Sequence, residues 1–320
     1  MRKRGGYYLK YKSAVPAEAV FYLCCSISFG ACLLIRADVC TDAVRGAVRL
    51  CLDTLIPALF PFIVLNGIFL GAGGAELAAR TLGRVFSRVF KVSPSLCAPF
   101  FIGLTAGFPS GAAAVARVYS NGGCSKNDAE RALAFSSNAG PAFAIGGIGA
   151  LLGDIRLGGV IYAAQTVSAV LLARLLPRGK NEGAGDEAPV PAPAPGLLTR
   201  AVTGAVTPML CVCAFVIVFA PVTALLGRGL ELAGLPALPR SAILSAVELT
   251  NGASFAASAL TRRAAAAVCA FGLSFSGLCV HAQTASYTTD AGLSLKYFLP
   301  GRLFMGALSA AMVWFAAGYC

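Results

Sequence analysis

The stretch Gly103-Leu-Thr-Ala-Gly-Phe-Pro-Ser-Gly111 lies in the middle of an apolar run, residues 96–118, and limits how the chain can fold. Its three glycines and its proline do not continue a plain helix. Ser136-Ser-Asn-Ala-Gly-Pro141 interrupts the next apolar run, residues 131–152, in the same way. Irregular backbone at membrane depth persists only where protein or a water-filled cavity covers it. These breaks therefore predict a covered site inside a bundle of membrane helices.

The composition agrees with a membrane setting. Of the 320 residues, 57% are hydrophobic and 12% are charged, and the mean hydropathy is +0.75. A soluble domain has about 25% charged residues, so the composition excludes a soluble enzyme, a disordered chain and a collagen-like fibre. Apolar runs cover residues 19–35, 52–72, 96–118, 131–152, 157–176, 201–226, 242–260, 264–285 and 299–318. The sequence predicts an all-α polytopic membrane protein with about 7–9 transmembrane segments, some of them broken or re-entrant.

The placement of the basic residues suggests a topology. The net charge is +12, but Lys and Arg occupy short loops and form no stripe that would bind nucleic acid. The basic N-terminus, Met1 to Lys12, precedes a retained first helix, and we expect it to be cytoplasmic. If residues 131–152 and 264–285 are re-entrant, the excess of basic loops inside is larger than for nine simple crossings. That topology also makes the two halves of the chain an inverted repeat, an arrangement common in secondary transporters.

Two further features concern the loops and the cysteines. Arg80, Arg84 and Arg88 recur on one face of residues 76–92, which predicts an interfacial amphipathic helix, a solvated loop helix being the alternative. The twelve cysteines lie mostly in apolar runs and include no Cys-x-x-Cys pair, so they indicate small buried side chains and not a disulfide framework. With a single histidine, a zinc site is not expected. We expect no metal and no cofactor.

The two halves look related in sequence. Thr54-Leu-Ile-Pro57 is echoed by Ala205-Val-Thr-Pro208, and the breaks of the first half are echoed at Leu249-Thr-Asn-Gly252 and Ser274-Phe-Ser-Gly277. Chance similarity in a chain rich in Ala and Gly is the alternative. The predicted organisation is a basic N-terminus with a first helix (1–44), a first half (45–176), a Pro-rich acidic linker (177–196) and a second half (197–320).

Polar residues gather at the breaks, where a helix N-terminus would suit an anion. The alternative is that the glycines only allow close helix packing. Glu248 is an acid inside an apolar run, which indicates a role with a coupling ion or a solute; an ion pair with Arg117 or an interfacial position is the alternative. His281 could titrate near neutral pH or serve as an interfacial hydrogen-bonding residue. The candidate solute-binding residues are Gly107, Pro109, Ser110, Gly111, Ser137, Asn138, Gly140, Glu248, Asn251, Gly252, Ser274, Ser276, Gly277, His281 and Gln283.

Five motifs in order carry a resemblance to a known family. They are residues 55–62 (LIPALFPF), 103–111, 137–141, 247–252 (VELTNG) and 274–283 (SFSGLCVHAQ). Together they resemble the sporulation integral membrane proteins of the YlbJ type, which contain two nucleoside-recognition Gate domains similar to part of the concentrative nucleoside transporters. The resemblance implies a role in endospore formation in a Gram-positive bacterium, with transport of dipicolinic acid toward the developing spore. Phe108-Pro-Ser-Gly111 departs from the Tyr-Pro-x-Gly of the family pattern, which leaves the solute open.

The leading hypothesis is a transporter in the bacterial cell membrane, or in a membrane around the spore, that moves a small anionic aromatic solute through a midplane site. Its partners would be the lipid bilayer, the solute, and further copies of itself or other sporulation membrane proteins. A non-transporting scaffold for spore-envelope assembly and a nucleoside transporter are the alternatives. An intramembrane enzyme is disfavoured, because the sequence shows no nucleophile–base pair, metal cluster or phosphate-binding loop.

Overall fold

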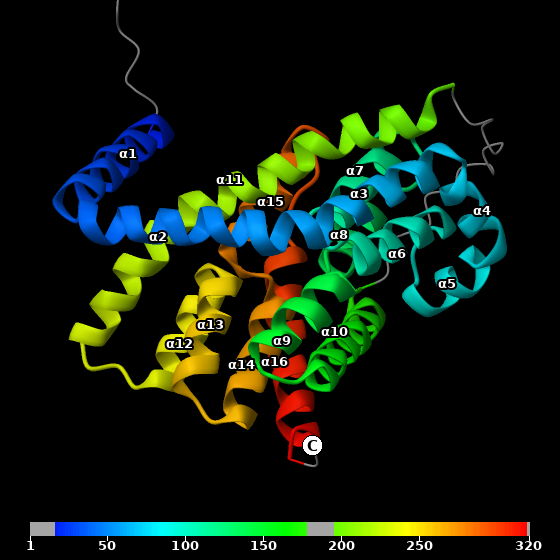
Figure 1. Ribbon diagram of the computed structural model, residues 1–320. Helices are drawn as coiled ribbons and strands as arrows, with labels where there is room; N and C mark the ends of the chain where they lie inside the picture. The colour runs from blue at the N-terminus through cyan, green and yellow to red at the C-terminus, as the bar shows by residue number, and fades with distance from the viewer. Residues whose placement is uncertain (1–16, 178–194, 319–320) are drawn as a thin grey trace, which may run out of the picture.

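The computed structural model describes residues 17–177 and 195–318, and every regular element in these ranges is a helix (Figure 1). Four helices are long and apolar enough to cross a membrane, or up to six if each of two bent pairs forms one span. Three further apolar helices are shorter, at Leu59–Gly71, Ala142–Leu151 and Ala237–Val247. The chain is therefore an all-α polytopic membrane protein with broken helices. The basic N-terminus and most of the predicted linker lie outside the described residues.

Residues 17–175 form ten α-helices, two π-helical segments (Cys51–Leu55 and Ala142–Ile148) and a 3-10 turn, Pro94–Leu96. The α-helices are α1 (Ala17–Ile35), α2 (Ala37–Leu50), α3 (Ile56–Gly71), α4 (Gly74–Thr81), α5 (Gly83–Phe90), α6 (Cys97–Ala106), α7 (Ser110–Ser120), α8 (Lys126–Ser136), α9 (Gly149–Leu151) and α10 (Ile155–Leu175). The second half contains α11 (Leu197–Leu232), α12 (Ala237–Val247), α13 (Leu249–Ala259), α14 (Arg262–Phe275), α15 (Gly277–Thr289) and α16 (Phe298–Ala316).

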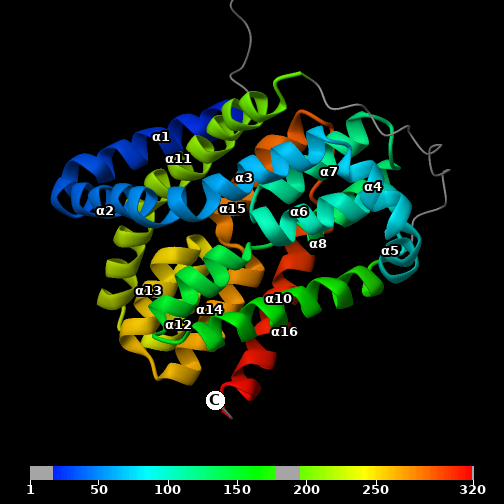
Figure 2. The same ribbon diagram turned by 45° about the vertical axis from the view of Figure 1, so that its right-hand side comes forward.

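Two sets of neighbouring helices pack antiparallel. Gly67 lies against Ala201, whereas the Cys51 thiol lies 4.0 Å from the carbonyl oxygen of Cys213, so α11 is antiparallel to α2 and α3. Figure 2 shows these long helices side by side. In α10 and α16, Ser168 bonds Ser309 at 2.9 Å, while Gly301, nearer the start of α16, lies against the later residue Leu172 of α10. The inverted repeat of the two halves stays a prediction.

Each half contains one helical hairpin that folds back on itself. In the first half α6 turns into α7, and a Cβ on Gly111 would lie only 2.8 Å from the Cα of Gly103. In the second half α12 turns into α13 at Glu248, and Gly252 lies directly against the backbone of Ser245. Small residues in both arms permit this approach.

The tight hairpins lie at other segments than those predicted to be re-entrant. The sequence predicts re-entrant segments at residues 131–152 and 264–285, whereas the hairpins form at residues 97–120 and 237–259. The segment Arg262–Thr289 instead passes as one candidate span, broken locally at Ser276. Loop charge only reports the side of the membrane on which a loop lies. It does not distinguish which of two neighbouring broken segments turns back.

The predicted amphipathic helix is split into α4 and α5, and α5 lies at about a right angle (96°) to the helix that follows it. Arg84 and Arg88 of α5 are exposed, whereas Phe86 and Phe90 are buried against Phe100. The amphipathic character is confirmed. Its position at a membrane interface stays a prediction.

Candidate functional site

A pocket forms where the two hairpin tips meet the two broken helices. Its space, including the part open to solvent at the mouth, is about 480 Å³. The first hairpin and the break after α8 contribute one side, and α13 and α15 contribute the other. The long helices α3 and α11 complete the wall. The lining residues are Leu55, Leu59, Gly107, Phe108, Ala139, Gly140, Phe143, Val212, Val216, Glu248, Leu249, Thr250, Cys279, Val280 and Gln283.

Each hairpin tip contacts the broken helix of its own half. Gly107 has φ +83° and ψ −170°, a backbone conformation open essentially to glycine alone. A Cβ on Gly140 would lie 2.7 Å from the carbonyl oxygen of Thr105, so the break packs directly on the tip. In the second half, a Cβ on Gly277 would lie 3.2 Å from the Leu249 amide nitrogen. The glycines of the motifs therefore both permit close packing and shape the pocket.

Glu248 lines the pocket at the tip of the second hairpin and is 3% exposed. Its carboxylate accepts hydrogen bonds from the backbone N–H groups of Thr250 (2.9 Å) and Asn251 (2.8 Å), so it caps the N-terminus of α13. No ion pair between Glu248 and Arg117 forms among the described residues, whereas the depth of Glu248 in the membrane stays a prediction. The Glu248 cap therefore occupies backbone N–H groups at the start of α13, near Gly252, where the sequence predicts that an anion binds.

Gln283 brings an amide into the pocket from α15. Its Nε2 contacts the Cys279 sulfur at 3.5 Å, whereas its Oε1 has no hydrogen-bond partner within the described part of the chain. The side chain is 2% exposed. A buried acceptor without a partner is costly, so this oxygen can receive an N–H or O–H group of a solute.

Of the predicted site residues, Gly107, Gly140, Glu248 and Gln283 line the pocket. The others lie beside or behind it. Those outside the lining are Pro109, Ser110, Gly111, Ser137, Asn138, Asn251, Gly252, Ser274, Ser276, Gly277 and His281.

Several of these outer residues hold the site together. Ser274 donates to Ser309 at 2.7 Å, and Asn251 donates to the Thr223 hydroxyl at 3.1 Å. His281 lies 2.8 Å from the carbonyl oxygen of Phe275 through Nε2, which satisfies the last turn of α14. Its position beside α14 gives it a structural contact and no place in the pocket wall.

Two buried residues that support the breaks were missed in the sequence. Gln165 of α10 holds the first break with both amide atoms, accepting from the Ala139 N–H (3.0 Å) and donating to its carbonyl oxygen (3.1 Å). Arg302 of α16 contacts both breaks, at Asn138 and at Ser276. The rule that singled out Glu248, an ionisable residue inside an apolar run, applies equally to Arg302.

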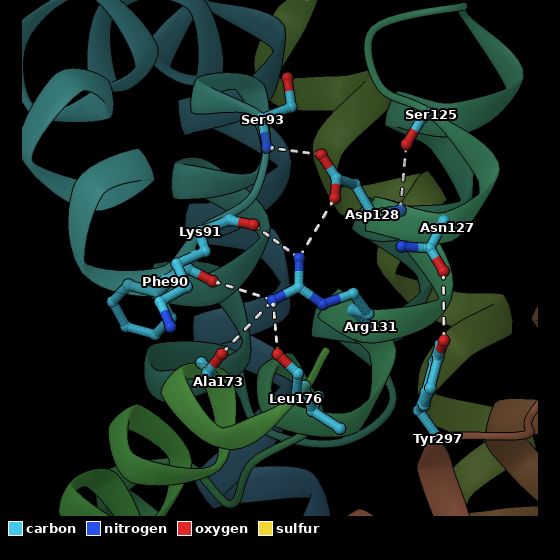
Figure 3. Close-up of polar contacts among 10 residues, drawn as sticks. All are labelled: Phe90, Lys91, Ser93, Ser125, Asn127, Asp128, Arg131, Ala173, Leu176 and Tyr297. Atoms are coloured by element: carbon cyan, nitrogen blue, oxygen red, sulfur yellow. Dashed lines mark hydrogen bonds and ion pairs between the residues drawn. The ribbon is translucent and has the colours of Figure 1, made fainter. Parts of the chain in front are cut away.

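Arg131 anchors the far end of α8 (Figure 3). Its guanidinium donates to the carbonyl oxygens of Lys91 (2.5 Å), Phe90 (3.4 Å), Ala173 (3.4 Å) and Leu176 (3.5 Å), and it pairs with Asp128 at 3.3 Å. These oxygens lie at the C-terminal ends of α5 and α10 and just beyond them. One buried side chain thus ties three helices together away from the pocket.

A second tie joins α8 to the loop before α16. Glu130 accepts from the Ser294 N–H at 3.0 Å and pairs with Lys296 at 2.6 Å. Burial raises the pKa of Glu130, but the hydrogen bonds from Lys296 and Ser294 outweigh it and hold this pKa below its ordinary value.

Within the described residues no group of three or more His, Cys, Asp or Glu side chains could hold a metal ion. The cysteines of this part of the chain are free thiols.

Comparison with known proteins gives one relative at low identity. The chain is 23% identical over 314 aligned residues to the sporulation integral membrane protein YlbJ of Bacillus subtilis (strain 168), an alignment that covers 85% of this chain and 76% of that protein. No protein-family profile matches the chain, and no solved structure matches it. The similarity extends over most of both chains and agrees with an integral protein of a bacterial membrane.

Proposed function

We propose that this protein has a membrane role in sporulation and transports a small anionic aromatic solute, with dipicolinic acid as the candidate, and that it is not an enzyme. The two halves would act as inverted Gate-like units around one midplane site. The observation that carries the proposal is the pocket at which both hairpin tips and both breaks meet. Inverted halves with discontinuous helices around one site are typical of secondary transporters.

The chemistry of the wall supports an aromatic solute with polar substituents. Leu55 at the end of the Cys51–Leu55 π-helix, Leu59 of α3, and Val212 and Val216 of α11 give apolar contact. The polar side chains of the wall are few and belong to the second half, at Glu248, Thr250 and Gln283, and the Gln283 amide can donate to a solute carboxylate. A mostly apolar pocket with a small number of placed polar groups is typical of small-molecule sites. The relative's name, a sporulation protein of the membrane, supports the setting of the proposal.

Uptake into proteoliposomes tests the function. Purified protein is reconstituted, and entry of radiolabelled dipicolinate is compared with entry into protein-free liposomes. We expect uptake by the wild type and its loss in Glu248→Gln, which removes the carboxylate that would hold a coupling ion. Glu231→Gln is the matched control, because Glu231 lies near the end of α11, exposed and paired with Arg240, and it should transport like the wild type.

Wild-type uptake equal to that of empty liposomes would refute transport of this solute. Entry of radiolabelled uridine into the same proteoliposomes tests the nucleoside alternative. If neither solute enters, the scaffold hypothesis is favoured.

A further inference from the structure

Arg302 is fully buried between the two halves of the protein. Its Nη1 donates to the side-chain oxygen of Asn138 (3.3 Å) and to the carbonyl oxygen of Ala134 (3.4 Å), both at the first break. Its Nη2 donates to the hydroxyl of Ser276, at the second break. The same guanidinium therefore touches both broken helices.

No carboxylate among the described residues lies within ion-pair distance of Arg302. Its partners are two neutral oxygens of the first break, one hydroxyl and the sulfur of Met305, and its Nε has no partner among them. The other fully buried arginine, Arg131, has Asp128 beside it. A buried charge without a counter-ion is expensive, and in membrane proteins such residues are usually functional.

The charge lies directly behind the pocket. Asn138 is followed by Ala139 and Gly140, which line the wall, and Ser276 is followed by α15, which carries Gln283. The pocket wall contains one carboxylate, Glu248, whose oxygens already accept two backbone N–H groups of α13. No ion pair therefore compensates the positive charge of Arg302 among the described residues.

We propose that Arg302 is a specificity-determining residue whose fixed positive charge makes the pocket prefer an anionic solute to its neutral isostere. It acts from behind the breaks, without touching the solute. This inference rests on the proposed function, because it assumes that the pocket binds a solute. A unit charge at roughly 10 Å and an effective dielectric constant of about 20 changes an affinity by at least about tenfold.

A purely structural clamp predicts a different result from a charge selector. If Arg302 only holds the breaks in place, its loss weakens the binding of charged and neutral solutes by the same factor. If it selects charge, the ratio of the two affinities changes. The ratio is the quantity to measure.

The test uses the purified full chain and isothermal titration with two probes, pyridine-2,6-dicarboxylate and its neutral diamide. We expect the wild type to prefer the dicarboxylate and Arg302→Gln to lose at least about tenfold of that preference. Arg302→Lys keeps the charge and should keep the preference, even if it binds both probes less tightly. Arg131→Gln, at the other buried arginine, should leave the ratio unchanged.

A second variant covers the case in which Arg302→Gln does not fold. Asn138→Asp places a carboxylate on the atom that already accepts from Nη1 at 3.3 Å, so it neutralises the charge within the native contact. It should lose the preference as well. If the ratio of the two affinities is unchanged in the folded variants, this inference is wrong and the proposed function stands. The same holds if the wild type binds both probes equally. A wild type that binds neither probe overturns the proposed function and this inference with it.

Discussion

The two buried glutamines provide the sharpest test of the site, because the same substitution should have opposite effects at the two positions. Gln165→Leu removes the side chain that bonds both the N–H and the carbonyl oxygen of Ala139. It leaves two buried backbone groups unpaired, each costing about 1–3 kcal/mol, so we expect a loss of about 2–6 kcal/mol in the free energy of unfolding. Gln283→Leu removes an oxygen that has no partner and an amide whose contact is a sulfur at 3.5 Å.

For Gln283→Leu we therefore expect stability between unchanged and about 1 kcal/mol higher, since an unpaired buried acceptor is replaced by an apolar group of similar size. Its affinity for dipicolinate should nevertheless fall, because the Gln283 amide N–H, whose contact is a sulfur, is lost as a donor to a carboxylate of the solute. A gain in stability with a loss of function is the usual signature of a polar group kept for binding. The Gln283 side chain would thus lower the free energy of unfolding when no solute is bound.

The assay is thermal unfolding of the purified variants in one detergent, followed by fluorescence, with and without dipicolinate. The wild type and Gln283→Leu should unfold at similar temperatures without solute, and solute should raise the Tm of the wild type only. Gln165→Leu should unfold several degrees lower. If Gln283→Leu is as unstable as Gln165→Leu, the Gln283 oxygen has a structural partner and the reasoning fails.

Three further predictions concern packing and charge. Gly140→Ala places a Cβ 2.7 Å from a backbone oxygen of the hairpin tip and should abolish solute binding, whereas Gly146→Ala meets nothing within 4 Å and should bind normally in the same titration. Arg131→Met should lower the free energy of unfolding by about 3–5 kcal/mol, because it breaks a buried ion pair and uncaps two helices; equal denaturation midpoints would contradict this. The Tm advantage of the wild type over Glu130→Gln should be full above pH 4.5, the ordinary value, and should vanish as pH falls through the lowered pKa of Glu130. A pH-independent advantage would show that the pair with Lys296 does not set it.

Much of the architecture was predictable because its causes are local. The length of the apolar runs predicted membrane helices, and glycine and proline marked each break within a few residues. Glu248 was found because a charge in an apolar run is rare. The same argument applies to Arg302, although the apolar run of residues 299–318 otherwise predicts a plain membrane span.

The remaining features depend on contacts between distant segments. Whether a broken segment turns back depends on small residues in both arms meeting, as Gly103 and Gly111 do, and loop charge carries no information about this. The apolar residues of the pocket wall could also not be predicted from the sequence. Val212 and Val216 lie in a helix that is apolar on all sides, where a pocket-lining valine and a lipid-facing valine look alike.

The central claim, that solute occupies the pocket between the hairpin tips and the breaks, is tested most directly by protection of Cys279. This thiol lines the pocket, and a variant that keeps it as the single cysteine can be labelled with a small methanethiosulfonate reagent. We predict that dipicolinate slows labelling of Cys279 and leaves unchanged the labelling of a single-cysteine control at Cys32, which is exposed and lies outside the pocket lining. Equal labelling of Cys279 with and without dipicolinate, in a variant that still takes up the solute, would contradict the account.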